Sequence, residues 1–108
     1  MGPLPEYLPD LTGFQWDAGN SEKNCLAHDV SLAETEQVFF NRPILLASDP
    51  AHSKTEARYF VLGRTNAGRR LAMVFTIRGT LLRPIMARDM SRAERKLYAE
   101  REDAKEAP

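Results

Sequence analysis

The segment that most constrains the fold lies between residues 58 and 88, where apolar and polar side chains alternate in three runs. Asn66-Ala67-Gly68 separates the first two runs and Gly79-Thr80 the last two, and both sequences are typical of β-hairpin turns. We therefore predict three neighbouring antiparallel strands, at residues 58–65, 69–78 and 81–88.

The lengths of the two turns predict the register of this sheet. They bring Arg58, Thr76 and Arg83 into one row that crosses all three strands. The same face is predicted to carry Phe60, Leu62, Val74 and Ile85. The opposite face is bulkier, so we expect it to meet the helices; it is predicted to carry Tyr59, Val61, Met73, Phe75, Ile77 and Met86. Because Pro84 cannot donate a ladder hydrogen bond, it predicts an edge strand or a bulge.

The rest of the chain supplies helices and shorter strands. Residues 14–17 alternate like a short strand, and residues 20–28 follow as a short helix that Asp17 can cap. A capping box at Ser31 predicts a helix to about residue 40, residues 44–47 read as a strand, and a capping box at Ser91 predicts a helix to about residue 102. The predicted fold class is α+β: a small antiparallel meander of three to four strands plus a short N-terminal strand, with two N-terminal helices and one C-terminal helix.

Length and composition describe one small domain. A chain of 108 residues buries about two thirds of its unfolded surface, which suffices for a single core. We assign residues 14–102 to that domain, the proline-rich residues 1–13 to an extended or mobile arm, and residues 103–108 to a frayed tail. Neither a signal peptide nor a membrane-spanning stretch is recognisable, so we expect a cytoplasmic protein that does not contact membranes.

Positive charge is concentrated in the middle of the chain, although the formal net charge is zero. Residues 1–41 hold one lysine and seven acidic residues, whereas residues 42–96 hold twelve basic and four acidic residues. Eleven of the fifteen basic residues are arginine, whose planar guanidinium group binds phosphate in a bidentate manner. The middle of the chain can therefore hold a polyanion. The alternative is that these arginines pair with acidic helices of the same molecule.

Few catalytic groups are available. The single cysteine excludes an internal disulfide and a cysteine-based zinc site, and no metal-ligand spacing or glycine-rich phosphate loop is found, so we expect neither metal nor cofactor. RNA cleavage needs proton transfer at the 2′-hydroxyl and the leaving oxygen, and stabilisation of negative charge between them. Strand arginines suit the last need, and His28 or His52 suits the first. Trp16 can stack on an unpaired base, or it can belong to the core.

Short motifs from Phe14 to Tyr98 follow one another in a distinctive order. They are Phe14-x-Trp16-Asp17, Asn24, His28-x-Val30-Ser31, Val38-Phe39, Asp49-Pro50, His52-Ser53, Glu56-x-Arg58, Leu62-Gly63-Arg64, Gly68-Arg69, Val74-Phe75-Thr76-x-Arg78, Arg83, Ala87-Arg88, Glu94-Arg95 and Tyr98. This series resembles BrnT-type toxins of bacterial type II toxin–antitoxin systems. The resemblance implies a RelE-like and ParE-like fold, an RNA substrate, and neutralisation by a BrnA-like ribbon-helix-helix antitoxin, through which alone the toxin reaches promoter DNA.

The resemblance and the residues together predict a metal-independent endoribonuclease. The predicted catalytic residues are His28 for proton transfer and, around the scissile phosphate, Arg58, Arg64 and Arg83. The predicted RNA-binding residues are Trp16, Lys23, Arg78 and Arg88. Many similar toxins carry lysine where this chain has Asn20 and Ala27, which keeps open a second hypothesis: an inactive homologue that binds its antitoxin. A third hypothesis is a plain RNA-binding module.

Overall fold

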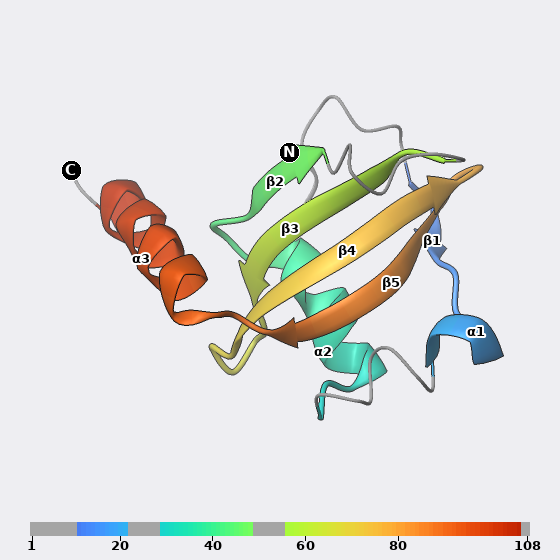
Figure 1. Ribbon diagram of the computed structural model, residues 1–108, viewed down its shortest axis with the longest axis horizontal. Helices are drawn as coiled ribbons and strands as arrows, with labels where there is room; N and C mark the ends of the chain where they lie inside the picture. Colours follow the sequence, from blue (N-terminus) through green and yellow to red (C-terminus); the bar gives the residue numbers. More distant parts are fainter. Residues whose placement is uncertain (1–10, 22–28, 49–55, 107–108) are drawn as a thin grey trace.

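The computed structural model describes residues 11–21, 29–48 and 56–106. Five strands form one sheet in the order β1-β5-β4-β3-β2. The strands are β1 (Gly13–Phe14), β2 (Leu45–Ser48), β3 (Arg58–Arg64), β4 (Arg70–Arg78) and β5 (Leu81–Asp89). The helices are α1 (Ala18–Ser21), α2 (Leu32–Gln37), the 3-10 helix η2 (Val38–Phe40) and α3 (Arg92–Glu106). Figure 1 shows α2 behind the sheet and α3 beyond one end of it.

The central meander confirms the predicted strands and turns. Arg58 pairs with Thr76, and Thr76 pairs with Arg83, so the predicted cross-strand row exists. Gly68 and Gly79 both adopt positive φ, at 90° and 62°, as the two hairpin turns require. The turn chemistry therefore sets the register between β3, β4 and the first part of β5.

The first strand differs from the prediction in length and direction. β1 contains only Gly13 and Phe14 and runs parallel to β5, which makes the sheet mixed rather than purely antiparallel. It ends early because Asp17 turns the chain into α1: the Asp17 carboxylate accepts a hydrogen bond from the Gly19 amide at 2.8 Å. The helix therefore begins at Ala18, two residues before its predicted start, and the predicted residues 22–28 lie outside the described residues.

A β-bulge beside Pro84 shifts the register within β5. Phe75 pairs with Pro84, but the preceding residue Val74 pairs with Met86, so one extra residue is accommodated in β5. Pro84 thus marks a bulge, which was one of its two predicted roles. The prediction for Met86 is wrong: because opposed residues share a face, it lies with Val74 and not on the face covered by α2.

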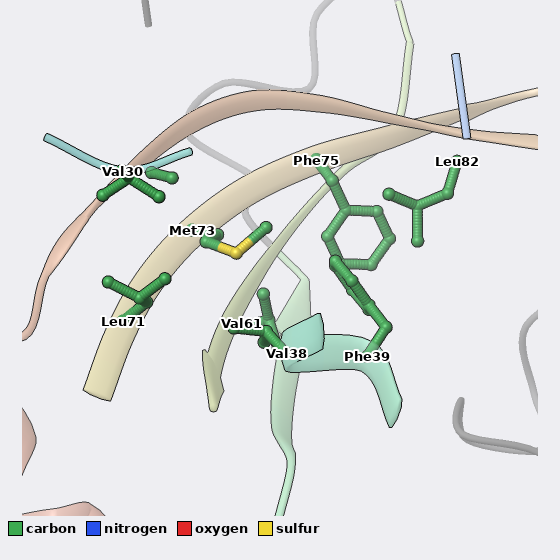
Figure 2. Close-up of a cluster of buried hydrophobic side chains, with 9 residues drawn as sticks. Val30, Val38, Phe39, Val61, Leu71, Met73, Phe75 and Leu82 are labelled. Atoms are coloured by element: carbon green, nitrogen blue, oxygen red, sulfur yellow. The ribbon is translucent and has the colours of Figure 1, made fainter. Parts of the chain in front are cut away.

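The main core lies between the sheet and the α2–η2 segment. Ser31 and Glu34 form the predicted capping box, which starts α2 so that Val38 and Phe39 reach the sheet fully buried. Figure 2 shows the Phe39 ring beneath Phe75, and their centroids are 5.2 Å apart in an edge-to-face arrangement. The bulky face meets α2 and η2 as predicted, whereas α3 packs on the other face. The buried members of this core are Val30, Val38, Phe39, Val61, Leu71, Met73, Phe75, Leu82 and Ala87.

Helix α3 covers one end of the other face of the sheet. Its Tyr98 is buried against Leu62 and Ala72, and the Tyr98 hydroxyl donates to the Pro43 carbonyl at 2.6 Å. Ser91 caps the helix as predicted, and the helix continues to Glu106, four residues beyond the predicted end. The end of this face that carries the row of Arg58, Thr76 and Arg83 lies farther along the strands, away from α3.

Candidate functional site

The candidate site is built on the cross-strand row at the end of the sheet away from α3. Arg58 opens β3, Thr76 lies in β4 and Arg83 lies in β5, so each strand contributes one side chain. Directly opposed side chains have Cβ atoms about 5 Å apart, which places the two arginines on either side of the threonine. Thr76 is buried, and its hydroxyl donates to the Ala57 carbonyl at 2.6 Å. The row is therefore anchored in the sheet.

Arg83 is held in place by side chains from the segment before α1. Its Nη1 and Nη2 atoms donate to the two carboxylate oxygens of Asp17 at 2.8 and 3.1 Å, and Nη1 also donates to Gln15 Oε1 at 3.1 Å. Only 12% of the Arg83 side chain is exposed. The hydrogen bonds from Arg83 and from the Gly19 amide lower the pKa of Asp17, so its carboxylate is charged at neutral pH.

A second carboxylate, that of Glu56, lies near the turn between β4 and β5. Arg78, on the same face two residues beyond Thr76, donates to both carboxylate oxygens of Glu56 at 3.0 and 3.2 Å. The hydrogen bonds from Arg78 lower the pKa of Glu56, and the charges of Arg58 and Arg83 contribute in the same direction. Three guanidinium groups thus act on one carboxylate. Together with Asp17, these groups bring three positive and two negative charges to this end of the sheet.

This arrangement suits the binding of an anion. The carboxylates of Asp17 and Glu56 already occupy bidentate positions on two guanidinium groups, and a phosphate group offers the same oxygen geometry. An incoming phosphate can therefore take the place of a carboxylate without reorienting the arginine. We call Arg58, Thr76, Arg78 and Arg83 the arginine cluster.

Two other predicted arginines lie elsewhere. Arg64 is at the far end of β3, six residues and about 20 Å along the strand from Arg58. Its Nη1 lies 3.4 Å from a carboxylate oxygen of Glu102 in α3. Arg88 donates to both carboxylate oxygens of Glu94, at 2.7 and 3.0 Å. The structure does not bring these two arginines together with the arginine cluster, because both lie near the other ends of their strands, where they pair with acidic residues of α3.

The remaining predicted residues fall into two groups. Trp16 is half-buried, and its indole Nε1 donates to a carboxylate oxygen of Glu36 at 2.8 Å, which ties this segment to α2. Lys23 and His28, together with the alternative His52, lie outside the described residues. In the described ranges, no group of three or more histidine, cysteine, aspartate or glutamate side chains is placed to hold a metal ion. No helix in those ranges is long and apolar enough to cross a bilayer.

Sequence reasoning missed the two carboxylates of the cluster, although one of them left a signal. The predicted register between β3 and β4, continued past the start of β3, places Glu56 opposite Arg78. The pattern Glu56-x-Arg58 also puts both charges on one face of an extended segment. Asp17 gave no comparable signal, because its contact with Arg83 depends on where β1 meets β5, 66 residues away in the sequence.

The fold and the arginine cluster define a class: a small α+β domain that gathers guanidinium groups on one face of its sheet, at the end away from α3. A protein-family model matches residues 16–94, and its description is ribonuclease toxin, BrnT, of type II toxin–antitoxin system. The chain therefore belongs to the BrnT family of ribonuclease toxins. No match is found among curated proteins. The matched residues include α1, the whole meander and every member of the arginine cluster.

Proposed function

We propose that this chain is a metal-independent endoribonuclease that binds the scissile phosphate at Arg58 and Arg83. The observation that carries the proposal is the row in which these two arginines flank a buried threonine on three adjacent strands. A rigid sheet holds such groups with little freedom, which favours stabilisation of charge that develops during the reaction. Membership of a ribonuclease toxin family supports RNA as the polyanion.

The proposed mechanism begins with an exchange of anions. A phosphate of the RNA displaces the Asp17 carboxylate from Arg83, and Arg58 contacts the same phosphate from the other side of Thr76. Both guanidinium groups then stabilise the extra negative charge that forms when the 2′-oxygen attacks phosphorus and the 5′-oxygen leaves. We assign the proton transfers to His28, because the ordinary pKa of histidine lies near neutrality. Arg78 binds a neighbouring phosphate in place of Glu56.

We assign Arg64, Arg88 and Trp16 to the fold and not to RNA. The two arginines hold α3 through ion pairs with Glu102 and Glu94, and the indole is engaged by α2. For the partner, we propose a BrnA-like ribbon-helix-helix antitoxin that carries the complex to promoter DNA. We also propose that the toxin acts in the cytoplasm and that its fold is RelE-like. The family description, which names a type II toxin–antitoxin system, supports the antitoxin.

The decisive experiment compares two arginines of the same sheet. Arg83→Ala and Arg83→Lys remove bidentate phosphate binding at the arginine cluster, whereas Arg64→Ala removes an arginine about 20 Å from Arg58 along β3. We expect both Arg83 variants to relieve growth arrest on induced expression and to lose RNA cleavage in vitro, while Arg64→Ala retains both activities. Thermal unfolding confirms that each variant is folded. A folded Arg83→Ala variant with undiminished cleavage would contradict the proposal.

A second candidate function is that of an inactive homologue that only binds antitoxin. One observation favours it: the guanidinium groups of Arg78 and Arg83 are both already paired with carboxylates of the same chain. The two functions differ in their effect on RNA. Incubation of the purified chain with cellular RNA gives cleavage fragments under the first function and intact RNA under the second, with antitoxin binding retained in both cases.

A further inference from the structure

An apolar row lies next to the arginine cluster on the same face of the sheet. Phe60 pairs with Val74, and Val74 pairs with Met86, so these three side chains cross β3, β4 and β5 together. Phe60 and Val74 are each two residues along their strand from the row of Arg58 and Thr76, a separation of about 7 Å. We call Phe60, Val74 and Met86 the apolar row.

The apolar row is only partly covered in the described structure. On the side away from the arginine cluster, Leu62 and Ala72 are buried beneath α3. The members of the apolar row are half-buried, and Phe60 packs with one side against the cluster under α3. Figure 1 views the sheet with α2 behind it, and neither α2 nor α3 lies in front of the middle of β3, β4 and β5. Phe60 is therefore supported by the cluster under α3 and remains partly exposed among the described residues.

We propose that the apolar row is a stacking platform for one unpaired base of the RNA whose phosphate lies on the arginine cluster. The inference rests on the function proposed above and adds the class of substrate. A nucleotide carries a flat apolar base beside a charged phosphate, and this face carries an aromatic ring beside two guanidinium groups. Bases buried inside a duplex cannot reach such a platform, so the substrate is single-stranded RNA.

The chemistry of the platform also defines its selectivity. None of the three side chains of the apolar row has a polar group that reads the edge of a base. Stacking on an aromatic ring tolerates every base, because each base has a π-face. The position next to the cleaved phosphate is therefore recognised as a base without strong preference for its identity.

The experiment measures binding to a single-stranded 2′-O-methyl oligoribonucleotide, which cannot be cleaved at its blocked 2′-oxygens. A second probe has the same length and phosphates but abasic sugars. Phe60→Leu keeps an apolar side chain of similar size and removes the ring, and Phe60→Tyr keeps the ring. Phe40→Ala is the matched control, because this phenylalanine is 62% exposed and belongs to η2, which packs behind the sheet.

We expect Phe60→Leu to weaken binding of the intact strand about five-fold or more, with Phe60→Tyr and Phe40→Ala close to the wild type. The wild type should bind the abasic probe more weakly than the intact strand. The wild type and Phe60→Leu should bind the abasic probe with the same affinity. Thermal unfolding shows that the leucine variant remains folded.

Two results overturn the inference while the proposed function stands. The first is that the wild type binds the intact and the abasic probe with equal affinity and that Arg83→Ala binds neither. This result would show that only phosphates are recognised. The second is a Phe60→Leu variant that binds RNA normally but loses antitoxin, which assigns this face to the partner protein. Failure of the wild type to bind either probe overturns the proposed function itself, and the platform with it.

Discussion

The ion pair between Glu94 and Arg88 gives a quantitative prediction for stability. Glu94 accepts hydrogen bonds from both Nη atoms of Arg88 and from the Ser91 amide, where α3 begins. The hydrogen bonds from Arg88, with a further contribution from Ser91, lower the pKa of Glu94 from 4.5 to about 2 against the opposing effect of burial. This carboxylate is therefore strongly stabilised in its charged form.

The expected magnitude follows from the change in pKa. A fall from 4.5 to about 2 corresponds to about 3 kcal/mol in favour of the folded state at neutral pH. Because 20% of the Glu94 side chain is exposed, water screens part of this energy, and we expect about 1–2 kcal/mol. The pKa of the folded state is depressed, so the stabilisation is complete above pH 4.5 and is lost as the pH falls towards 2.

The perturbation is Glu94→Gln, which removes the charge but retains a side chain that can complete the capping box. Urea unfolding at pH 7 should show a loss of about 1–2 kcal/mol, and the difference from wild type should disappear as the pH falls towards 2. Glu100→Gln, at an exposed position on the same helix, is the control and should be neutral. A difference between Glu94→Gln and wild type that is independent of pH would refute the electrostatic reasoning.

Three further predictions concern packing, a buried hydrogen bond and the site. Gly63→Ala should cost about 1–3 kcal/mol in thermal unfolding, because its Cβ would lie 2.5 Å from Cγ1 of buried Val38; an unchanged midpoint would contradict this. Tyr98→Phe should cost about 1–2 kcal/mol by leaving the Pro43 carbonyl without its donor. Burial raises the pKa of Tyr98 from 10 to about 12. The free energy by which the neutral hydroxyl stabilises the fold is therefore present below pH 10 and is lost as the pH rises towards 12. Unfolding measured at alkaline pH, with Tyr98→Phe for comparison, tests this loss. Asp17→Asn should strengthen RNA binding, because it removes the carboxylate that competes for the Arg83 guanidinium group while keeping a helix cap. A fluorescence titration measures the affinity. Weaker binding would show that the carboxylate assists binding instead.

Local chemistry explains what the sequence predicted well. Gly68 and Gly79 determine turns of defined length, and those turns fix which residues face each other across the meander. Ser31 and Ser91 begin helices through hydrogen bonds within three residues of themselves. In each case the decisive contact lies inside a short window, so the pattern of residues is sufficient.

Contacts between distant segments explain what the sequence could not supply. The parallel pairing of β1 with β5 and the contact of Asp17 with Arg83 both depend on where the N-terminal segment docks. The pairing of Arg64 with Glu102 depends on the direction of α3 after Met90, which its capping box does not determine. The bulge was predicted from Pro84 as one of two outcomes, but its effect on Met86 follows only from the observed register.

The extra residue in β5 gives a single strand two separate tasks. Before the extra residue, the side chain of Arg83 points to the face that carries the arginine cluster. After the extra residue, the order in which side chains point to the two faces is shifted by one, so Arg88 points to the same face and reaches α3. If β5 alternated regularly over the same residues, without the bulge, the second guanidinium group would turn inwards, against the apolar layer around Phe39. The bulge therefore decides which side of the sheet Arg88 occupies, and a deletion that removes only the extra residue should leave both guanidinium groups on the side they occupy now.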